Sequence, residues 1–195
     1  MPGRERTDVT TRALDGRHRA VVRMGNPVLR ERAQDIPHDR FGTRFLRDLG
    51  RDLLRTMFED NGVGLAAPQV GSGVRVFAYY VPGEGDRDAV PPRVLVNPVL
   101  TLVGEPTELG WEGCLSVPGL RGMVPRHPAV KVSTFDTDGN ELTFEAEGFH
   151  ARVIQHEHDH LDGIVFLDRM TDMSSLMFEE EWEQYAKEKD LPVEV

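Results

Sequence analysis

The segment of this sequence with the clearest chemical potential is 155–160, which reads QHEHDH. Residues four apart on an α-helix lie one turn above each other, so His156 and His160 can present imidazole nitrogens to one divalent ion. Glu157 lies about 100° around the helix from His156, where its carboxylate can reach a water beside that ion. The segment therefore predicts a hydrolytic metal site. A polar helix face with two solvated histidines is the alternative that it leaves open.

The source of a third ligand is a separate question, because a catalytic metal site usually takes three protein ligands. Asp162 and Asp168 follow the helix, and Cys114 lies upstream in a stretch whose glycines and Pro118 indicate a shaped turn. Cys114 is the only cysteine of the chain. It therefore forms no internal disulfide, which fits a reducing compartment. An inert core position for Cys114 is the other interpretation of this residue.

Composition limits the classes of function. The chain has 195 residues, 39% of them hydrophobic and 29% charged, which is the balance of one globular domain. The net charge of −10 and the lack of a basic stripe argue against direct binding to nucleic acid. No apolar run approaches the ~18 residues of a membrane span, and the amino-terminal segment has no apolar block typical of a secretory signal. We therefore expect a cytoplasmic location and no membrane contact.

The hydrophobic pattern predicts helices on either side of a strand-rich middle. Residues 21–40 look irregular, and apolar spacing predicts a helix that begins after Thr43 and ends at Asn61. Strands are expected at 74–81, 93–96, 99–103 and 107–111, and a hairpin at 129–135 and 141–147. Further helices are expected at 148–161, stopped by Gly163, and from Ser174 or Ser175 to about Lys187.

These elements predict a single α+β domain. Its antiparallel sheets would pack around the central helix of the carboxyl-terminal half, which carries the HExxH motif, with one helix before and one after. We expect the inward face of the central helix to carry Phe149, Val153, His156 and His160. By the same helical phase Arg152, His158 and Asp159 are predicted to be exposed.

Three segments together give a family resemblance. Residues 62–70 (GVGLAAPQV), 112–116 (EGCLS) and 155–160 (QHEHDH) resemble the motifs of peptide deformylases in order and spacing. The resemblance extends from about Val22, through 26–30 (NPVLR), to about Arg169. It implies removal of the N-terminal formyl group from formyl-methionine of newly synthesised proteins, with release of formate.

The resemblance also implies roles for individual residues. Cys114, His156 and His160 would hold the metal, and Glu157 would be the general base. The Gln69 side chain and the backbone N–H of Leu115 would stabilise the oxyanion.

Five further residues receive roles from the same resemblance. Val63 and Gly64 would hydrogen-bond an extended peptide through the main chain, and Arg121 would lie near the substrate backbone. Glu112 and Arg126 would pair beneath the loop that carries Cys114.

The implied cofactor is one divalent metal ion, with iron(II) as the working ion and zinc, nickel or cobalt as replacements in a purified sample. The implied partners are nascent chains that begin with formyl-methionine. This implies proximity to the ribosome. The carboxyl-terminal segment is acidic, however, and its only basic residues after Phe178 are Lys187 and Lys189. Contact with ribosomal phosphates through this tail is therefore not expected.

The domain organisation follows from these limits. We expect residues 1–20 to form a mobile extension, 21–170 the catalytic domain, and 171–195 an acidic helix and tail. Three other interpretations stay open: an HExxH metallopeptidase in which Cys114 is idle, an inactive relative that only binds formylated amino termini, and a structural zinc site. The last would normally require a fourth protein ligand.

Overall fold

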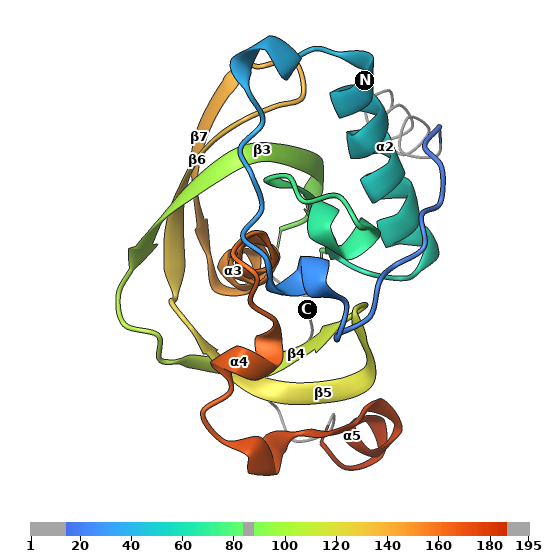
Figure 1. Ribbon diagram of the computed structural model, residues 1–195. Helices are drawn as coiled ribbons and strands as arrows, with labels where there is room; N and C mark the ends of the chain where they lie inside the picture. Colours follow the sequence, from blue (N-terminus) through green and yellow to red (C-terminus); the bar gives the residue numbers. More distant parts are fainter. Residues whose placement is uncertain (1–14, 84–87, 187–195) are drawn as a thin grey trace, which may run out of the picture.

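Two antiparallel β-sheets lie around helix α3 in the computed structural model, which describes residues 15–83 and 88–186 (Figure 1). The larger sheet has the strand order β1-β2-β3-β6-β7, and the smaller has the order β4-β5-β8. The predicted α+β class is therefore confirmed. Within the described ranges, no helix has the length and apolar character that a membrane crossing requires.

The helices and strands of the described residues come in a fixed order along the chain. They are η1 (Pro27–Arg30), η2 (His38–Arg40), α2 (Arg44–Glu59), β1 (Gly64–Ala66), η3 (Ala67–Val70), β2 (Val76–Val81), β3 (Val90–Val103), β4 (Glu108–Cys114), β5 (Val117–Arg126), β6 (Ala129–Phe135), β7 (Glu141–Glu147), α3 (Gly148–Leu161), α4 (Phe166–Arg169), η4 (Met173–Ser175), β8 (Met177–Phe178) and α5 (Glu179–Tyr185), where η denotes a 3-10 helix.

Helix α2 begins where the sequence predicts. The Thr43 side chain accepts a hydrogen bond from the backbone N–H of Leu46, which satisfies one of the free donors of the first turn. The buried face of α2 includes Leu49, Leu53 and Met57, and it packs on β1 and β2. This packing supports the strand that leads into the site.

Strand β3 corrects the sequence analysis, which divided it into strands at 93–96 and 99–103. It is one strand with a register shift between Val96 and Val99, and Asn97 there has a φ of 50°. Asparagine tolerates this left-handed conformation, and its side chain both accepts from Ile36 N and donates to Ile36 O. The irregularity lets one strand pair with β2 in its first half and β6 in its second.

The carboxyl-terminal region also differs from expectation. The helix predicted from Ser174 or Ser175 starts only at Glu179, after strand β8 has paired with β5, and Lys187 lies outside the described residues. Strand β5 was not predicted because Pro118, Gly119 and Pro125 interrupt its pattern. Strand β1 and helix α4 were too short to give a periodic signal.

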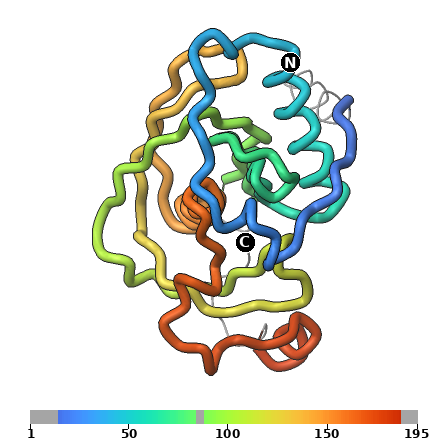
Figure 2. Tube along the Cα trace, viewed as in Figure 1, coloured from blue at the N-terminus to red at the C-terminus, as the bar shows by residue number. Residues whose placement is uncertain are grey.

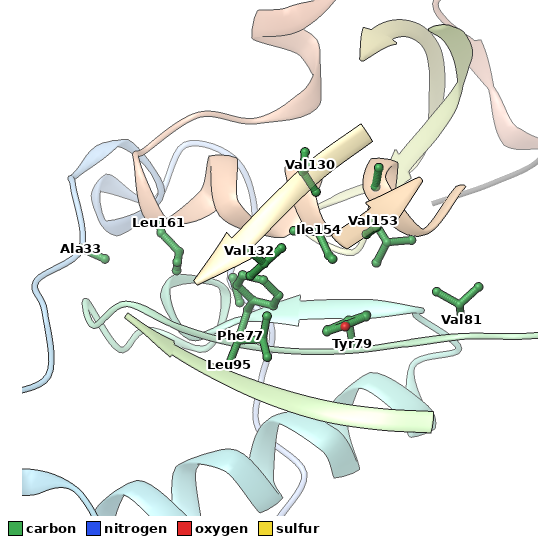
Figure 3. Packing of buried hydrophobic residues seen from close by; sticks show 13 residues of the cluster. Ala33, Phe77, Tyr79, Val81, Leu95, Val130, Val132, Val153, Ile154 and Leu161 are labelled. Carbon is green, nitrogen blue, oxygen red and sulfur yellow. The ribbon is translucent and has the colours of Figure 1, made fainter. Parts of the chain in front are cut away.

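Helix α3 has the predicted bounds, but its surroundings differ from the prediction. Its core neighbours come from β2, β3 and β6, as Figure 3 shows for Phe77, Leu95 and Val132 around Ile154 and Leu161. The helix is buried on almost every side. The predicted exposure of Arg152 and Asp159 is therefore wrong, since each is only 6% exposed. His158, also predicted to be exposed, is half-buried against Arg75.

The segment before α2 connects the parts that carry the site. The backbone N–H of Val22 donates to Gln69 O, and that of Met24 donates to Ser116 O. Further along, Ala33 N donates to Leu161 O at the end of α3. Figure 2 shows this segment in blue as it crosses the molecule between these regions. It therefore joins η3, the turn after β4, and α3.

Candidate metal centre

Cys114, His156 and His160 lie together although they come from different elements. Cys114 ends β4, and the two histidines lie one turn apart on α3. Their ligand atoms all lie within 4.8 Å of one another, and Cys114 Sγ is 3.3 Å from His160 Nε2. In a tetrahedral site with usual metal–sulfur and metal–nitrogen bonds, ligand atoms are separated by about 3.3–3.6 Å. The three side chains can therefore hold one divalent ion.

The two aspartates that could have supplied the third ligand are engaged elsewhere. Asp162 accepts from Arg75 Nη1 at 2.7 Å, and Asp168 pairs with Arg30. Neither belongs to the group of side chains that could share an ion with His156 and His160 in the described ranges. The geometry therefore favours Cys114.

The donor chemistry of the site fits a metal. Burial raises the pKa of the Cys114 thiol, but the positive charge of His160 and a hydrogen bond from His156 outweigh it and lower this pKa to about 5. The thiolate is the form that binds a metal. Glu112 Oε2 lies 2.9 Å from His156 Nδ1, which orients the ring so that Nε2 is available to an ion.

Glu157 follows directly after the first histidine. It is 2% exposed, and burial raises the pKa of its carboxyl group to about 7, although the neighbouring histidine charges act in the opposite direction. Its Oε2 atom has no hydrogen-bond partner among the residues that the structure describes. A Cβ atom on Gly64 would lie 2.2 Å from Glu157 Oε1. Only glycine therefore lets β1 approach this carboxylate.

Gln69 is oriented toward the same site. Its Oε1 accepts from Ala66 N at 2.8 Å, and this bond turns the amide nitrogen toward Cys114 Sγ and Ser116 Oγ, at 3.4 and 3.2 Å. The short helix η3, which starts with Ala67 and Pro68, places this buried side chain beside the turn after β4. The arrangement presents an N–H donor next to the ligand group.

A cavity of about 430 Å³ opens onto this group. Its lining includes residues 60–64, 113–115 and 117–121, together with Gln69, His156 and Glu157. The cavity thus brings together Val63, Gly64, Leu115 and Arg121, which the sequence analysis placed near a substrate.

Arg121 has a partner that the sequence analysis missed. Its guanidinium pairs with Glu179 at 2.6 Å and lies over the ring of Trp182, 4.6 Å from the ring centroid. Both partners belong to α5, and Glu179 also lines the cavity. Sequence offered no signal for this contact, because the acidic tail has the pattern of a solvated helix.

Glu112 and Arg126 form the expected pair, with bonds of 2.8 and 2.9 Å, inside a larger buried network. Arg126 also bonds Asp159 at 2.6 Å, and Arg152 bonds Glu112 at 2.8 Å. The Arg126 charge and hydrogen bond keep the pKa of Glu112 below its usual range despite complete burial. The spacing of Arg152, four residues before His156, was the available signal for its place in this network.

Comparisons with known proteins agree with the geometry. A family model described as polypeptide deformylase matches residues 18–175. Peptide deformylase 1 of Nitrosomonas europaea is 45% identical over 156 residues, which cover 78% of this chain and 88% of that protein. A class I type b peptide deformylase of Acinetobacter baumannii, solved with Met-Ala-Ser bound, gives a TM-score of 0.71 at 37% identity and covers 78% of this chain and 98% of its own. A peptide deformylase of Thermotoga maritima gives a TM-score of 0.71 at 36% identity, covering 80% and 99%.

Proposed function

The chain belongs to the polypeptide deformylase family, whose function is deformylation of formyl-methionine, and we propose that Cys114, His156 and His160 hold the metal on which this hydrolysis depends. The chain is accordingly a hydrolase of protein biosynthesis. One observation carries the residue assignment: the three ligand atoms lie within 4.8 Å of one another, with Glu157 next in sequence to His156.

The metal supplies Lewis-acid chemistry when it is bound, which suits attack of water on an unreactive formamide. One thiolate and two imidazoles suit iron(II), zinc, cobalt or nickel. We infer iron(II) as the ion in the cell, in line with the sequence resemblance. Metal analysis of protein purified without oxygen tests this inference.

Glu157 is the proposed general base. Its carboxylate accepts the proton of the attacking water and returns a proton to the departing amine. Gln69 Nε2 and the backbone N–H of Leu115 donate to the oxyanion that develops on the formyl oxygen. The Ala66 bond to Gln69 Oε1 supports this assignment, because it holds the amide nitrogen in a preorganised orientation.

We propose that the peptide part of the substrate binds along β1, where this strand borders the cavity. Strand β1 is the outer strand of its sheet, so one of its edges is free of strand pairing among the described residues. We propose that Val63 and Gly64 pair with the extended peptide there, and that Arg121 contacts its backbone further along. Glu112 orients the His156 ring through Nδ1, and Arg126 holds the Glu112 carboxylate in place.

The substrate class implies the setting of the enzyme. We propose that it acts on nascent chains in the cytoplasm, near the ribosome, without contact through a basic tail and without direct binding to nucleic acid. We keep the division into 1–20, 21–170 and 171–195 as a proposal. Residues 1–14 and 187–195 lie outside the described ranges. Just after the first of these segments, the backbone N–H groups of Arg17 and Arg19 donate to the side chains of Asp52 and Thr56 on α2.

Formate release tests the proposed function directly. Protein purified without oxygen and loaded with iron(II) is expected to release formate from formyl-Met-Ala-Ser. The acetylated peptide is expected to be rejected, because it adds a methyl group at the reacting carbon. Cleavage of internal peptide bonds without formate would support the metallopeptidase alternative. Binding of the formylated peptide without turnover would support the inactive relative.

Gly64→Ala is expected to lower kcat by about 10²-fold, because a methyl group 2.2 Å from Glu157 Oε1 must displace the carboxylate or the strand. The matched control is Gly73→Ala, whose added Cβ would meet no atom within 4 Å. Steady-state kinetics on formyl-Met-Ala-Ser measures both variants. A Gly64→Ala enzyme as fast as the Gly73→Ala enzyme would contradict the proposed place of Glu157.

A further inference from the structure

We propose that Arg152 is a positioning residue for the metal centre, which holds Glu112 against His156 and fixes α3 relative to the strand that carries Cys114. The inference rests on the proposed ligand set. Arg152 has no part in the three motifs that identify the family, and its helical phase predicted an exposed side chain. It is instead one of the most buried charged residues described, at 6% exposure.

The first contact of Arg152 is with the carboxylate that orients His156. Glu112 Oε1 accepts from Arg152 Nη1 and from Arg126 Nε, both at 2.8 Å. Glu112 Oε2 accepts from Arg126 Nη2 at 2.9 Å and lies 2.9 Å from His156 Nδ1. Four nitrogen atoms from three side chains thus surround a carboxylate that is 0% exposed. Without Arg152 the Oε1 atom would lose one of its two donors, and the carboxylate could turn away from the His156 ring.

The second set of contacts is with the strands. Arg152 Nη1 donates to Val124 O at 2.9 Å and to Gly110 O at 3.4 Å, and its Nη2 donates to Glu108 O. Gly110 and Glu108 lie on β4, which ends at Cys114. One side chain therefore connects α3 to the strand that presents the thiolate.

The position of Arg152 on its helix gives these contacts a direct path to the ligands. Arg152, His156 and His160 are spaced by four residues, so they lie on one stripe of α3. A shift of Arg152 along or around the helix axis would therefore move both imidazoles relative to Cys114. Glu112 in turn lies two residues before Cys114 on β4.

Gly110 shows that the strand is built to receive this guanidinium. A Cβ atom at this position would lie 2.8 Å from both Cζ and Nη2 of Arg152. Every other residue type would force the side chain off β4. Gly110→Ala therefore disturbs the contact while every charge of the network stays in the protein.

Charge also argues that Arg126 alone does not suffice for Glu112. Arg126 is shared between Glu112 and Asp159, which it bonds at 2.6 Å. Asp159 receives a second guanidinium from Arg169 at 2.7 Å, and Glu112 receives its second from Arg152. The two buried carboxylates are thus each bonded by two arginines. Loss of Arg152 would leave Glu112, the carboxylate that bonds His156, with one arginine that it shares with Asp159.

The test compares Arg152→Met, Arg152→Lys and Gly110→Ala with the control Arg75→Met. Arg75 is also 6% exposed and also contacts α3, at Leu161 O and His158 Nε2, and it bonds Asp162 just after the helix; none of these contacts is with Glu112. The readouts are the cobalt(II) dissociation constant from chelator competition, the visible absorption spectrum of the cobalt-loaded protein, and the Tm of the metal-free protein.

Arg152→Met is expected to weaken cobalt binding by about 10- to 100-fold and to change the absorption bands, as is usual when a partner of a metal ligand is lost. Gly110→Ala should shift both readouts in the same direction, and Arg152→Lys should retain part of the affinity. Arg75→Met should lower the Tm alone.

Wild-type affinity and spectrum in Arg152→Met would overturn the inference. If that variant does not fold, the same result in both Arg152→Lys and Gly110→Ala would overturn it. Failure of the proposed ligand set is distinguishable, because cobalt would then stay bound in Cys114→Ala.

Discussion

Replacing Glu157 with glutamine is expected to abolish deformylation while the protein keeps its metal. The amide has nearly the shape of the carboxylate but cannot accept a proton, and loss of a general base costs typically 10²–10⁴-fold in rate. The side chain is outside the group of three ligand atoms, so metal content should not change. The measurement is kcat on formyl-Met-Ala-Ser together with the metal content of the same preparation.

Glu147→Gln is the matched control for this variant. It makes the same chemical change at an exposed residue just before α3. Its kcat should equal that of the wild type. A Glu157→Gln enzyme with comparable kcat would show that another group removes the proton. Loss of metal from Glu157→Gln would instead place this carboxylate among the ligands.

Cys114→Ala is expected to remove most of the bound metal and with it the activity. It leaves two imidazoles, fewer than the three protein ligands of a usual catalytic site. The loss of metal affinity should exceed the loss of about 10- to 100-fold that follows removal of a residue that hydrogen-bonds a metal ligand. Cys114→Ser should also bind weakly, because a neutral hydroxyl replaces the soft thiolate. Metal analysis after dialysis against a chelator measures the effect.

The control for Cys114 comes from a histidine outside the ligand group. His127 bonds the carbonyl of Gly104 through its ring, so His127→Ala should keep the metal. His156→Ala should lose it as Cys114→Ala does. Full metal content in Cys114→Ser would instead support the alternative in which the thiol is idle.

Elements with strong local signals were predictable from sequence. The hairpin of β6 and β7 follows an alternating pattern around a turn, and its bounds agree with the prediction. Helix α3 has its predicted ends, because Gly148 and Gly163 adopt positive φ values of 55° and 75° there. The grouping of Cys114, His156 and His160 was predictable because each residue belongs to a recognisable motif, and the structure brings their thiol and imidazole atoms within 4.8 Å of one another. Their role as metal ligands stays a prediction.

The remaining features depend on contacts that no local pattern records. Helical phase assumes that one face of a helix is wet, but α3 is enclosed, so Arg152 and Asp159 meet partners in place of solvent. Strand β5 is held by pairing on both sides with β4 and β8, which overrides the prolines in its sequence. Glu179 meets Arg121 across 58 positions of the chain. Long-range pairing of this kind is decided by tertiary packing.

Because α3 is enclosed, burial of apolar surface alone does not fix its rotation and position in the fold, and the buried ion network supplies this specificity. A helix that is enclosed on most sides could enter the sheets in several rotations or one turn out of place with similar burial of its apolar residues. Such misplacement would leave Glu112 or Asp159 in the interior without a guanidinium, and breaking a buried pair costs about 3–5 kcal/mol. The buried ion pairs form a chain of alternating charges, in the order Arg152, Glu112, Arg126, Asp159 and Arg169. This chain disfavours wrong dockings of the helix. The energy gap between the native arrangement and its competitors therefore comes from charge matching as well as from shape.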